Sequence, residues 1–153
     1  MEIKAVETYI RPPRPTEVFV AGSIEMGAAE NWQERLAREF ENDPDVVLFN
    51  PRRDDWDSSW KQEIRDAQFF EQVSWEMDHI DQADIVFFYF SPGTQSPITL
   101  MELGYAVGKG YQCIVCCPEG FWRKGNVDIM CYRNEVPLVH DFETALEFLK
   151  AMV

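Results

Sequence analysis

Three acidic residues are candidates for catalytic chemistry. Glu102 is the only charged residue in the run Ser96–Val107, and the next basic residue, Lys109, is too far along a helix to be its i,i+4 partner. Glu76 and Asp78 belong to a second acidic segment, SWEMDHIDQAD. Two carboxylates brought together across a site are the groups that carry out glycosyl transfer. A buried carboxylate needs a partner or a function, so Glu102 is the first residue to explain.

Simpler structural explanations compete with a catalytic one. Glu102 could interact with the positive end of a helix dipole, or it could belong to a buried ion pair. Its position just after a strand-to-helix loop, among apolar neighbours, favours a function. Asp81 and Asp84 in the second segment are explained well enough as capping or solvent-facing residues.

Two loops supply candidate binding residues. Gly22 and Ser23 lie where backbone N–H groups could approach a ligand oxygen, although a turn that needs glycine explains them equally well. This loop has no G-x-G-x-x-G dinucleotide fingerprint. Trp56 lies in a polar loop and is predicted to contact a ligand or partner, whereas Phe69 and Phe70 have the helical spacing of core residues.

The candidates lie on an alternation of strands and helices. The predicted strands are 17–23, 46–50, 84–90, 112–118 and 137–140. The predicted helices are 28–41, 61–82, one that holds Glu102 and ends at Gly108–Gly110, and 142–152, with a loop at 121–127. This alternation predicts an α/β fold, a single doubly wound domain with a five-stranded parallel sheet and helices on both faces. Right-handed crossovers bring the strand-to-helix loops to one edge, where the candidates should meet.

The length of 153 residues fits one domain with a full core. Residues 1–15 end in RPPRP, which predicts an extended arm that is either disordered or lies on a neighbouring subunit. Residues 16–153 are predicted to form the domain.

Composition limits the classes of binding partner and the cellular location that can be expected. With 14 basic and 27 acidic residues the formal net charge is −13, and such a surface repels a nucleic-acid polymer. No run resembles a signal peptide or a membrane span, so a cytoplasmic protein without membrane contact is expected. The four cysteines are expected to be reduced core thiols, and with His79 and His140 as the only histidines no metal site is predicted.

Three separated motifs resemble the nucleoside 2-deoxyribosyltransferase family. They are VFVAGSI, WEMDHIDQADIVFFYF and SPITLMELGYAVGKG, in the family's order and spacing between about Glu17 and Val115. The resemblance implies a flavodoxin-like fold and makes Glu102 the nucleophile that attacks C1′ of a 2′-deoxynucleoside. Deoxyribose would then pass to a free nucleobase through a covalent intermediate, with no cofactor. Glu76, where the family usually has Asp, or Asp78 in its place, would position the sugar or shuttle a proton.

Departures from the family pattern leave the substrate open. Ser96 stands where the transferases often carry an Asp, and it resembles the related N-glycosidases that hydrolyse 2′-deoxynucleoside 5′-monophosphates. Glu25 stands where those glycosidases have an Arg, and a carboxylate there opposes a phosphate, so a nucleoside is favoured. Because Glu76 replaces the usual Asp, a non-catalytic nucleotide-binding module is a third possibility.

The resemblance also implies a homo-oligomer with shared active sites. In the transferases a C-terminal stretch of a neighbouring subunit completes the pocket, and Asn126 in RKGNV is the best candidate for that contribution. The predicted substrate-binding residues are therefore Gly22, Ser23, Ser96, Trp56 and Asn126.

Overall fold

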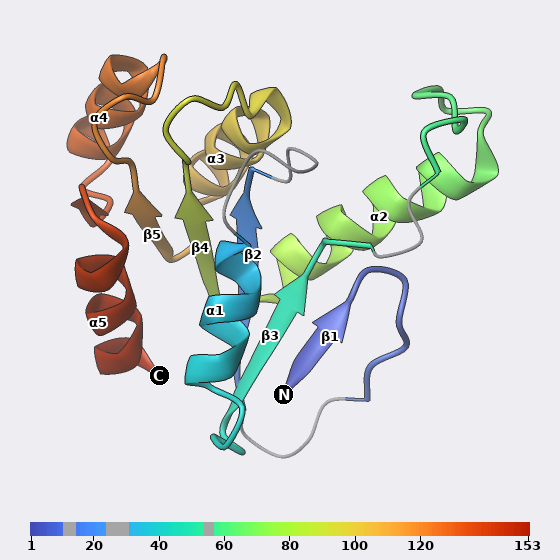
Figure 1. The fold of residues 1–153 in the computed structure, drawn as a ribbon, viewed down its shortest axis with the longest axis horizontal. Helices are drawn as coiled ribbons and strands as arrows, with labels where there is room; N and C mark the ends of the chain where they lie inside the picture. The colour runs from blue at the N-terminus through green and yellow to red at the C-terminus, as the bar shows by residue number, and fades with distance from the viewer. Residues whose placement is uncertain (11–14, 24–30, 54–56) are drawn as a thin grey trace.

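The computed structural model describes residues 1–10, 15–23, 31–53 and 57–153, which form a parallel sheet with helices on both faces (Figure 1). The strands are β1 (Glu2–Lys4), β2 (Thr16–Gly22), β3 (Val46–Asn50), β4 (Ile85–Tyr89), β5 (Cys113–Cys116) and β6 (Leu138–Val139). The helices are α1 (Trp32–Glu39), α2 (Ala67–Gln82), α3 (Pro97–Lys109), α4 (Lys124–Arg133) and α5 (Phe142–Met152). The predicted α/β class with a parallel sheet is confirmed.

The strand order creates a crevice near the middle of the sheet. The order is β1-β3-β2-β4-β5-β6, and each neighbouring pair is parallel. The chain passes from β2 to β3 on one side and then crosses back to β4 on the other, so the order reverses between β2 and β4. Doubly wound sheets bind ligands at the carboxyl ends of their strands at such a switch point. The loops after β2 and β4 therefore flank the expected binding region.

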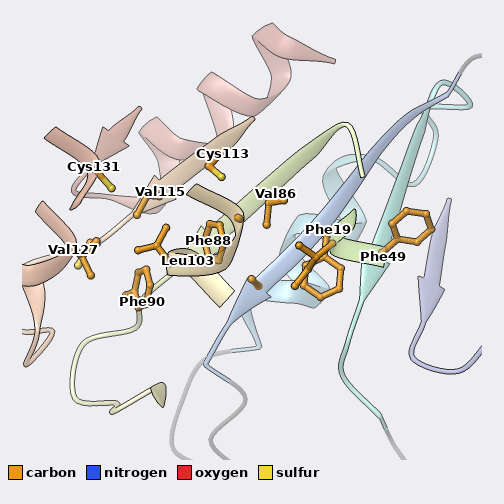
Figure 2. Packing of buried hydrophobic residues seen from close by; sticks show 14 of the residues in the cluster. Phe19, Phe49, Val86, Phe88, Phe90, Leu103, Cys113, Val115, Val127 and Cys131 are labelled. Atoms are coloured by element: carbon orange, nitrogen blue, oxygen red, sulfur yellow. The ribbon is translucent and has the colours of Figure 1, made fainter. Parts of the chain in front are cut away.

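Helices α2, α3 and α4 pack on one face of the sheet, and α1 and α5 pack on the other (Figure 1). Strands β3 and β5 are buried at every residue, which explains apolar sequences without alternation. On the α2–α4 face, Leu103 of α3 and Val127 of α4 belong to one buried cluster with Phe88 and Val115 of the sheet (Figure 2). This packing holds α3 firmly against the strands.

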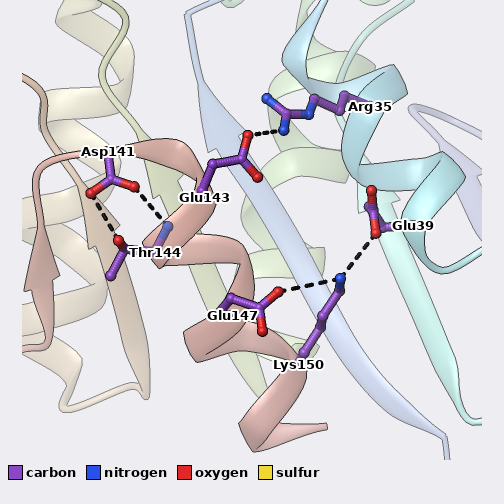
Figure 3. Close-up of polar contacts among 7 residues, drawn as sticks. All are labelled: Arg35, Glu39, Asp141, Glu143, Thr144, Glu147 and Lys150. Atoms are coloured by element: carbon purple, nitrogen blue, oxygen red, sulfur yellow. Dashed lines mark hydrogen bonds and ion pairs between the residues drawn. The ribbon is translucent and has the colours of Figure 1, made fainter.

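Charged side chains join α1 and α5 at the surface (Figure 3). Arg35 of α1 pairs with Glu143 of α5, while Lys150 of α5 lies 3.0 Å from Glu39 of α1 and 3.5 Å from Glu147. We call these five residues the α1–α5 ion-pair cluster. Exposed pairs of this kind each contribute roughly 0–1 kcal/mol to stability.

The sheet has six strands, so the prediction of five was wrong. The additional strand, β1, comes from the segment expected to be an extended arm, and it pairs with β3. The amino group of Met1 donates to the carbonyl of Val46 at 2.6 Å, and the N–H of Ala5 donates to the carbonyl of Asn50 at 3.0 Å. Without β1, the buried strand β3 would present an unpaired backbone edge. Residues 11–14, which hold most of RPPRP, lie outside the described residues.

Helix α4 is a second difference, because a loop was predicted over the start of this segment. The helix has no side-chain N-cap and contains Gly125, so the sequence carries no clear start signal. Val127 and Cys131 are buried against the sheet and stabilise α4 through tertiary packing. Packing has therefore overridden a weak local propensity.

Helix α2 begins later than its apolar pattern indicated. It starts at Ala67 and not at Lys61, because the carboxylate of Asp66 accepts the N–H of Phe69 at 3.0 Å and caps the helix there. With 16 residues it is the longest helix among those described. Within the described residues, no helix combines the length and apolar character needed to cross a lipid bilayer.

Candidate active site

A cavity of about 390 Å³ opens beside the switch point of the sheet. Its lining comes from the loops after β2 and β3, from α2, and from the first turns of α3: Gly22, Ser23, Pro51, Phe69, Gln72, Val73, Glu76, Met77, Ser96, Pro97, Ile98, Thr99, Met101 and Glu102. This volume lies within the range of small-molecule sites. The cavity is therefore the leading candidate for a ligand site.

Glu102 lines the cavity from the second turn of α3. Its side chain is only 7 % exposed, and no described residue gives it a hydrogen bond or an ion pair. Burial, and then the negative charge of Glu76, raise the pKa of Glu102 to about 8. Among the described residues this acidic group thus has no partner in a sheltered cavity, which is unusual for a purely structural residue.

Glu76 reaches the same cavity from α2, and Gln72 holds it from one turn earlier. The Nε2 of Gln72 donates to Glu76 Oε1 at 2.7 Å and to the carbonyl of Pro51 at 2.9 Å. Burial raises the pKa of Glu76, and the hydrogen bond from Gln72 opposes that rise. The described lining contains no Lys, Arg or His, so the two acidic side chains share the cavity without a counter-charge from it.

The loop before α3 holds Ser96 in an uncommon conformation. Its backbone is left-handed, with φ 46° and ψ 51°, and its hydroxyl does not cap α3. Such a conformation in a residue other than glycine costs on the order of 1–3 kcal/mol and is concentrated at functional sites. Pro97 suits the first helical position because it has no N–H to leave unpaired.

Three buried hydroxyl groups form a cluster at the cavity wall, which we call the hydroxyl cluster: Ser23, Thr94 and Ser96. Thr94 Oγ1 lies 2.7 Å from Ser23 Oγ and 3.0 Å from Ser96 Oγ, and the two serine hydroxyls are also hydrogen-bonded to each other. Thr94 donates its proton to the carbonyl of Ser91 at 2.8 Å. The two serines must therefore supply the only two protons for the three O···O contacts inside the cluster, so one contact at a time lacks a proton and acceptor lone pairs remain to spare.

Gly22 ends β2 where the chain enters the cavity wall. A Cβ atom at this position would lie 2.4 Å from Cζ2 of Trp32 and 2.6 Å from the carbonyl oxygen of Tyr89. The indole N–H of Trp32 donates to the carbonyl of Ser23 at 3.3 Å. Close packing therefore explains the glycine, and the same packing positions the hydroxyl of Ser23.

The cysteines lie away from the cavity lining. All four are free and buried, and burial raises the pKa of Cys113 to about 11 and of Cys116, Cys117 and Cys131 to about 12. This agrees with the prediction of core thiols. In the described part of the chain, no three His, Cys, Asp or Glu side chains are grouped so that they could hold a metal ion.

Comparison with known proteins agrees with this geometry. A model of nucleoside 2-deoxyribosyltransferase-like proteins matches residues 15–121, well over half of the chain. The chain belongs to this family. No curated protein matches the sequence. A conserved protein from Enterococcus faecalis V583, known from its crystal structure, has a TM-score of 0.65 at 15 % identity, over 91 % of this chain and 99 % of that one. At this identity the similarity shows a shared fold.

The residues that carry the family motifs meet in the cavity. Glu102, Glu76, Gly22, Ser23 and Ser96 all line it, although they come from three separate segments of the sequence. The carboxyl edge of the sheet and the switch point bring these segments together, as the alternation of elements predicted. Their catalytic and binding roles stay predictions.

Other predicted site residues lie elsewhere. Asp78 is exposed and does not line the cavity, because two residues along a helix correspond to more than half a turn. Asn126 is exposed on α4 and lines a separate hollow of about 470 Å³ between α3 and α4. Trp56 and Glu25 lie outside the described residues.

Sequence reasoning did not identify several lining residues of α2. Phe69, expected in the core, is half-buried and lines the cavity, whereas Phe70 is 54 % exposed. Gln72 was overlooked although it precedes Glu76 by four residues. Helical spacing puts these residues of α2 on the face of Glu76, so the signal was present once Glu76 was chosen.

Proposed function

We propose that this protein transfers 2-deoxyribose between nucleobases, with Glu102 as the nucleophile. The observation that carries the proposal is the pair of acidic side chains, Glu102 and Glu76, in one cavity of a nucleoside 2-deoxyribosyltransferase-like protein. Attack at C1′ requires a carboxylate oxygen that is free of other bonds, and no described residue engages Glu102.

The reaction uses one proton shared by the two carboxyl groups. In the reactive form Glu102 is ionised and Glu76 carries the proton. An oxygen of Glu102 bonds to C1′ while the C1′–N bond breaks, and the electron pair goes to the base, which takes the proton of Glu76. In the second half, an acceptor base attacks C1′, gives its proton to Glu76 and releases the carboxylate of Glu102. The configuration at C1′ is retained overall.

The raised pKa of Glu102 fits this scheme. Two like charges in a desolvated cavity oppose each other, so near neutral pH Glu102 holds a proton until the substrate binds. Substrate binding has to move that proton to Glu76. At low pH both groups are protonated and the nucleophile is lost, and at high pH the acid is lost. Activity is therefore expected to have a bell-shaped pH dependence.

A 2′-deoxynucleoside is the proposed substrate class. Without a 2′-hydroxyl the oxocarbenium-like transition state at C1′ is easier to reach. The cavity also offers apolar side chains against which a flat base can lie: Phe69, Val73, Met77, Ile98 and Met101.

The hydroxyl cluster is the proposed anchor for the 5′ end of the sugar. Because its protons are used internally, it presents acceptor sites that a 5′-hydroxyl donor can satisfy. A 5′-phosphate would instead enter a cavity with two acidic side chains and no Lys, Arg or His in its described lining. These features favour a nucleoside over its monophosphate.

A hydrolase of 2′-deoxynucleoside 5′-monophosphates is the second candidate. The hydroxyls of Ser23 and Ser96 can rotate to donate to a ligand. The N–H groups of Ile98 and Thr99, in the first turn of α3, have no acceptor within the helix. Both residues line the cavity. These donors are of the kind that a phosphate needs.

Glu76 is the proposed second acid, in preference to Asp78. Glu76 lines the cavity and influences the pKa of Glu102, whereas Asp78 is exposed and does neither. We further expect a homo-oligomer in which Asn126 of a second copy completes the site. Sedimentation of wild type and Asn126→Ala, together with their KM values, tests that expectation.

The deciding experiment is incubation of the protein with a 2′-deoxynucleoside, with and without a second free base, followed by chromatography. A new deoxynucleoside that forms only with the acceptor base supports transfer. A Glu102→Gln variant, checked for native folding by circular dichroism, should form none. Rapid quenching of wild type with the donor alone should show a deoxyribosyl ester on Glu102 by peptide mass spectrometry.

The other outcomes separate the alternatives. Free base without exchange, formed faster from the 5′-monophosphate than from the nucleoside, selects the hydrolase. Binding of either ligand without release of base selects a non-catalytic nucleotide-binding module and overturns the proposed chemistry.

A further inference from the structure

We infer that Gln72 is a positioning residue, whose amide holds Glu76 by one oxygen and so decides which of the two acids carries the charge and which oxygen passes the proton. The inference rests on the proposed function, because it gives Gln72 a role in the same proton transfer. Gln72 lines the cavity and joins Glu76 to the loop after β3.

Pro51 determines the orientation of the Gln72 amide. The carbonyl oxygen of Pro51 can only accept a hydrogen bond, so the amide atom 2.9 Å away must be the nitrogen. The same nitrogen lies 2.7 Å from Glu76 Oε1. Both amide protons are then used, one by the loop after β3 and one by the carboxyl group. A flip of the amide, which would exchange its oxygen and nitrogen, would lose both hydrogen bonds.

The rest of the amide is poorly satisfied, which argues against a purely structural role. The side chain of Gln72 is 4 % exposed, and its Oε1 receives no hydrogen bond within the described residues. A buried acceptor without a donor lowers stability. An apolar side chain of similar length would fill the space without that cost, so the two donated bonds explain the presence of glutamine.

The hydrogen bond from Gln72, which we call the Gln72 clamp, acts on only one of the two acids. Glu76 accepts an N–H, whereas no described residue donates to Glu102. An N–H donor stabilises a carboxylate more than the protonated acid. The other charged group in the described lining is Glu102 itself, and this lining has no Lys, Arg or His. The two acids thus differ in burial and in this hydrogen bond, and among the described residues the bond from Gln72 is the polar contact that distinguishes them.

The clamp also selects the oxygen that handles the proton. Since Oε1 of Glu76 already accepts from Gln72, a proton that reaches Glu76 binds to Oε2. In the first half-reaction that proton leaves Oε2 for the base nitrogen, which has received the electron pair of the breaking C1′–N bond. Negative charge returns to Glu76 at that moment and strengthens the bond from Gln72. Gln72 thus favours the step in which the proton leaves Glu76, and it opposes the earlier step in which the proton moves from Glu102 to Glu76.

The test compares Gln72→Met, which loses both donors, with Gln82→Met, which replaces an exposed glutamine in the last turn of the same helix. Two quantities are followed against pH: kcat/KM for a 2′-deoxynucleoside, and the ¹³C signal of the Glu76 carboxyl carbon, assigned with Glu76→Gln. In Gln72→Met the acidic limb of the profile and the Glu76 midpoint should both rise by about one pH unit. The basic limb and KM should stay unchanged. Gln82→Met should match wild type.

An unshifted Glu76 midpoint in Gln72→Met overturns the inference, as does a uniform loss of activity with an unchanged pH profile. If Gln72→Met does not fold, the wild type still decides. Its Gln72 side-chain ¹⁵N–H signals should shift with the Glu76 titration and stop doing so in Glu76→Gln, and pH-independent signals overturn the inference. The NMR titration needs no turnover. If the Glu76 midpoint shifts in Gln72→Met but the protein cleaves no deoxynucleoside, the proposed function is refuted while the hydrogen bond from Gln72 to Glu76 is supported.

Discussion

Acidic side chains occur in two contrasting surroundings in this protein. In the α1–α5 ion-pair cluster, Glu39 and Glu143 are accessible to solvent and each lies against a basic side chain (Figure 3). In the cavity, Glu76 and Glu102 are largely withdrawn from solvent and have no basic neighbour among the described lining residues. The exposed ion pairs change the free energy of unfolding only slightly. The arrangement in the cavity lowers stability, and a function explains why such an arrangement is kept.

The largest expected effect is on turnover. Glu102→Gln removes the proposed nucleophile, so kcat for deoxyribose transfer should fall by at least about 10³-fold. Glu143→Gln, the matched change in the ion-pair cluster, should leave kcat unaltered. Steady-state assays by chromatography check both. A Glu102→Gln protein that keeps a sizeable fraction of wild-type turnover would remove Glu102 from the mechanism.

The second effect is on the pH dependence of stability. The pKa of Glu102 is about 8 in the folded protein, against an ordinary value of 4.5. Between these values the folded state binds the extra proton, so the free energy of unfolding should fall as the pH rises from about 4.5 to about 8. In Glu102→Gln this fall should be largely absent, whereas Glu143→Gln should retain it. Urea unfolding across this pH range measures the free energy of unfolding. If that free energy depends on pH in the same way in wild type and Glu102→Gln, burial of Glu102 does not lower stability as expected.

A smaller effect should follow when a positive charge, which the described cavity lining lacks, is introduced beside Glu102. Ile98 lines the cavity one turn before Glu102 and is 56 % exposed, so a lysine there can keep its charge and still approach the carboxyl group. Ile98→Lys should lower the pKa of Glu102 by about one unit, as a nearby cation favours the carboxylate. NMR titration of the Glu102 carboxyl carbon measures the shift. Ile98→Gln serves as the uncharged control, and an equal midpoint in both variants would show that the lysine does not reach Glu102.

The smallest effect is expected in the ion-pair cluster. Lys150→Met removes the charge that faces Glu39 and Glu147 while it keeps the aliphatic stem. The free energy of unfolding should fall by less than about 1 kcal/mol. In about 1 M salt the difference from wild type should nearly vanish. Loss of several kcal/mol on Lys150→Met would mean that the surface pairs matter far more than their exposure indicates.

The fold was largely predictable because its information is local. Apolar runs without alternation marked β3, β4 and β5, and the N-cap Asp141 marked the start of α5, where it accepts the N–H of Thr144 at 2.8 Å. β1 was not predictable, since three ordinary residues become a strand only when the edge of β3 is available. Helix α4 was missed because its stability comes from burial of Val127 and Cys131 and not from its own capping.

The candidate site was predictable in part for the same reason. Glu102 stood out by its isolation in an apolar run, and Glu76 by its family motif. The choice between Glu76 and Asp78 needed the rotation of α2 relative to the cavity, which the packing of the whole helix decides. The hydroxyl cluster combines Ser23 with Thr94 and Ser96, which lie 71 and 73 residues further along the chain.

The sequence by itself determined which chemical groups were available, the order of most strands and helices, and therefore the edge of the sheet at which the loops would gather. Those properties depend on residue type and on periods of two and 3.6 residues, which short segments already express. Only the tertiary structure decided that Glu102 remains without a partner among the described residues, and that Gln72 joins Pro51 to Glu76. Burial, desolvation and hydrogen bonds between distant segments depend on strand order and helix packing, which no single segment encodes.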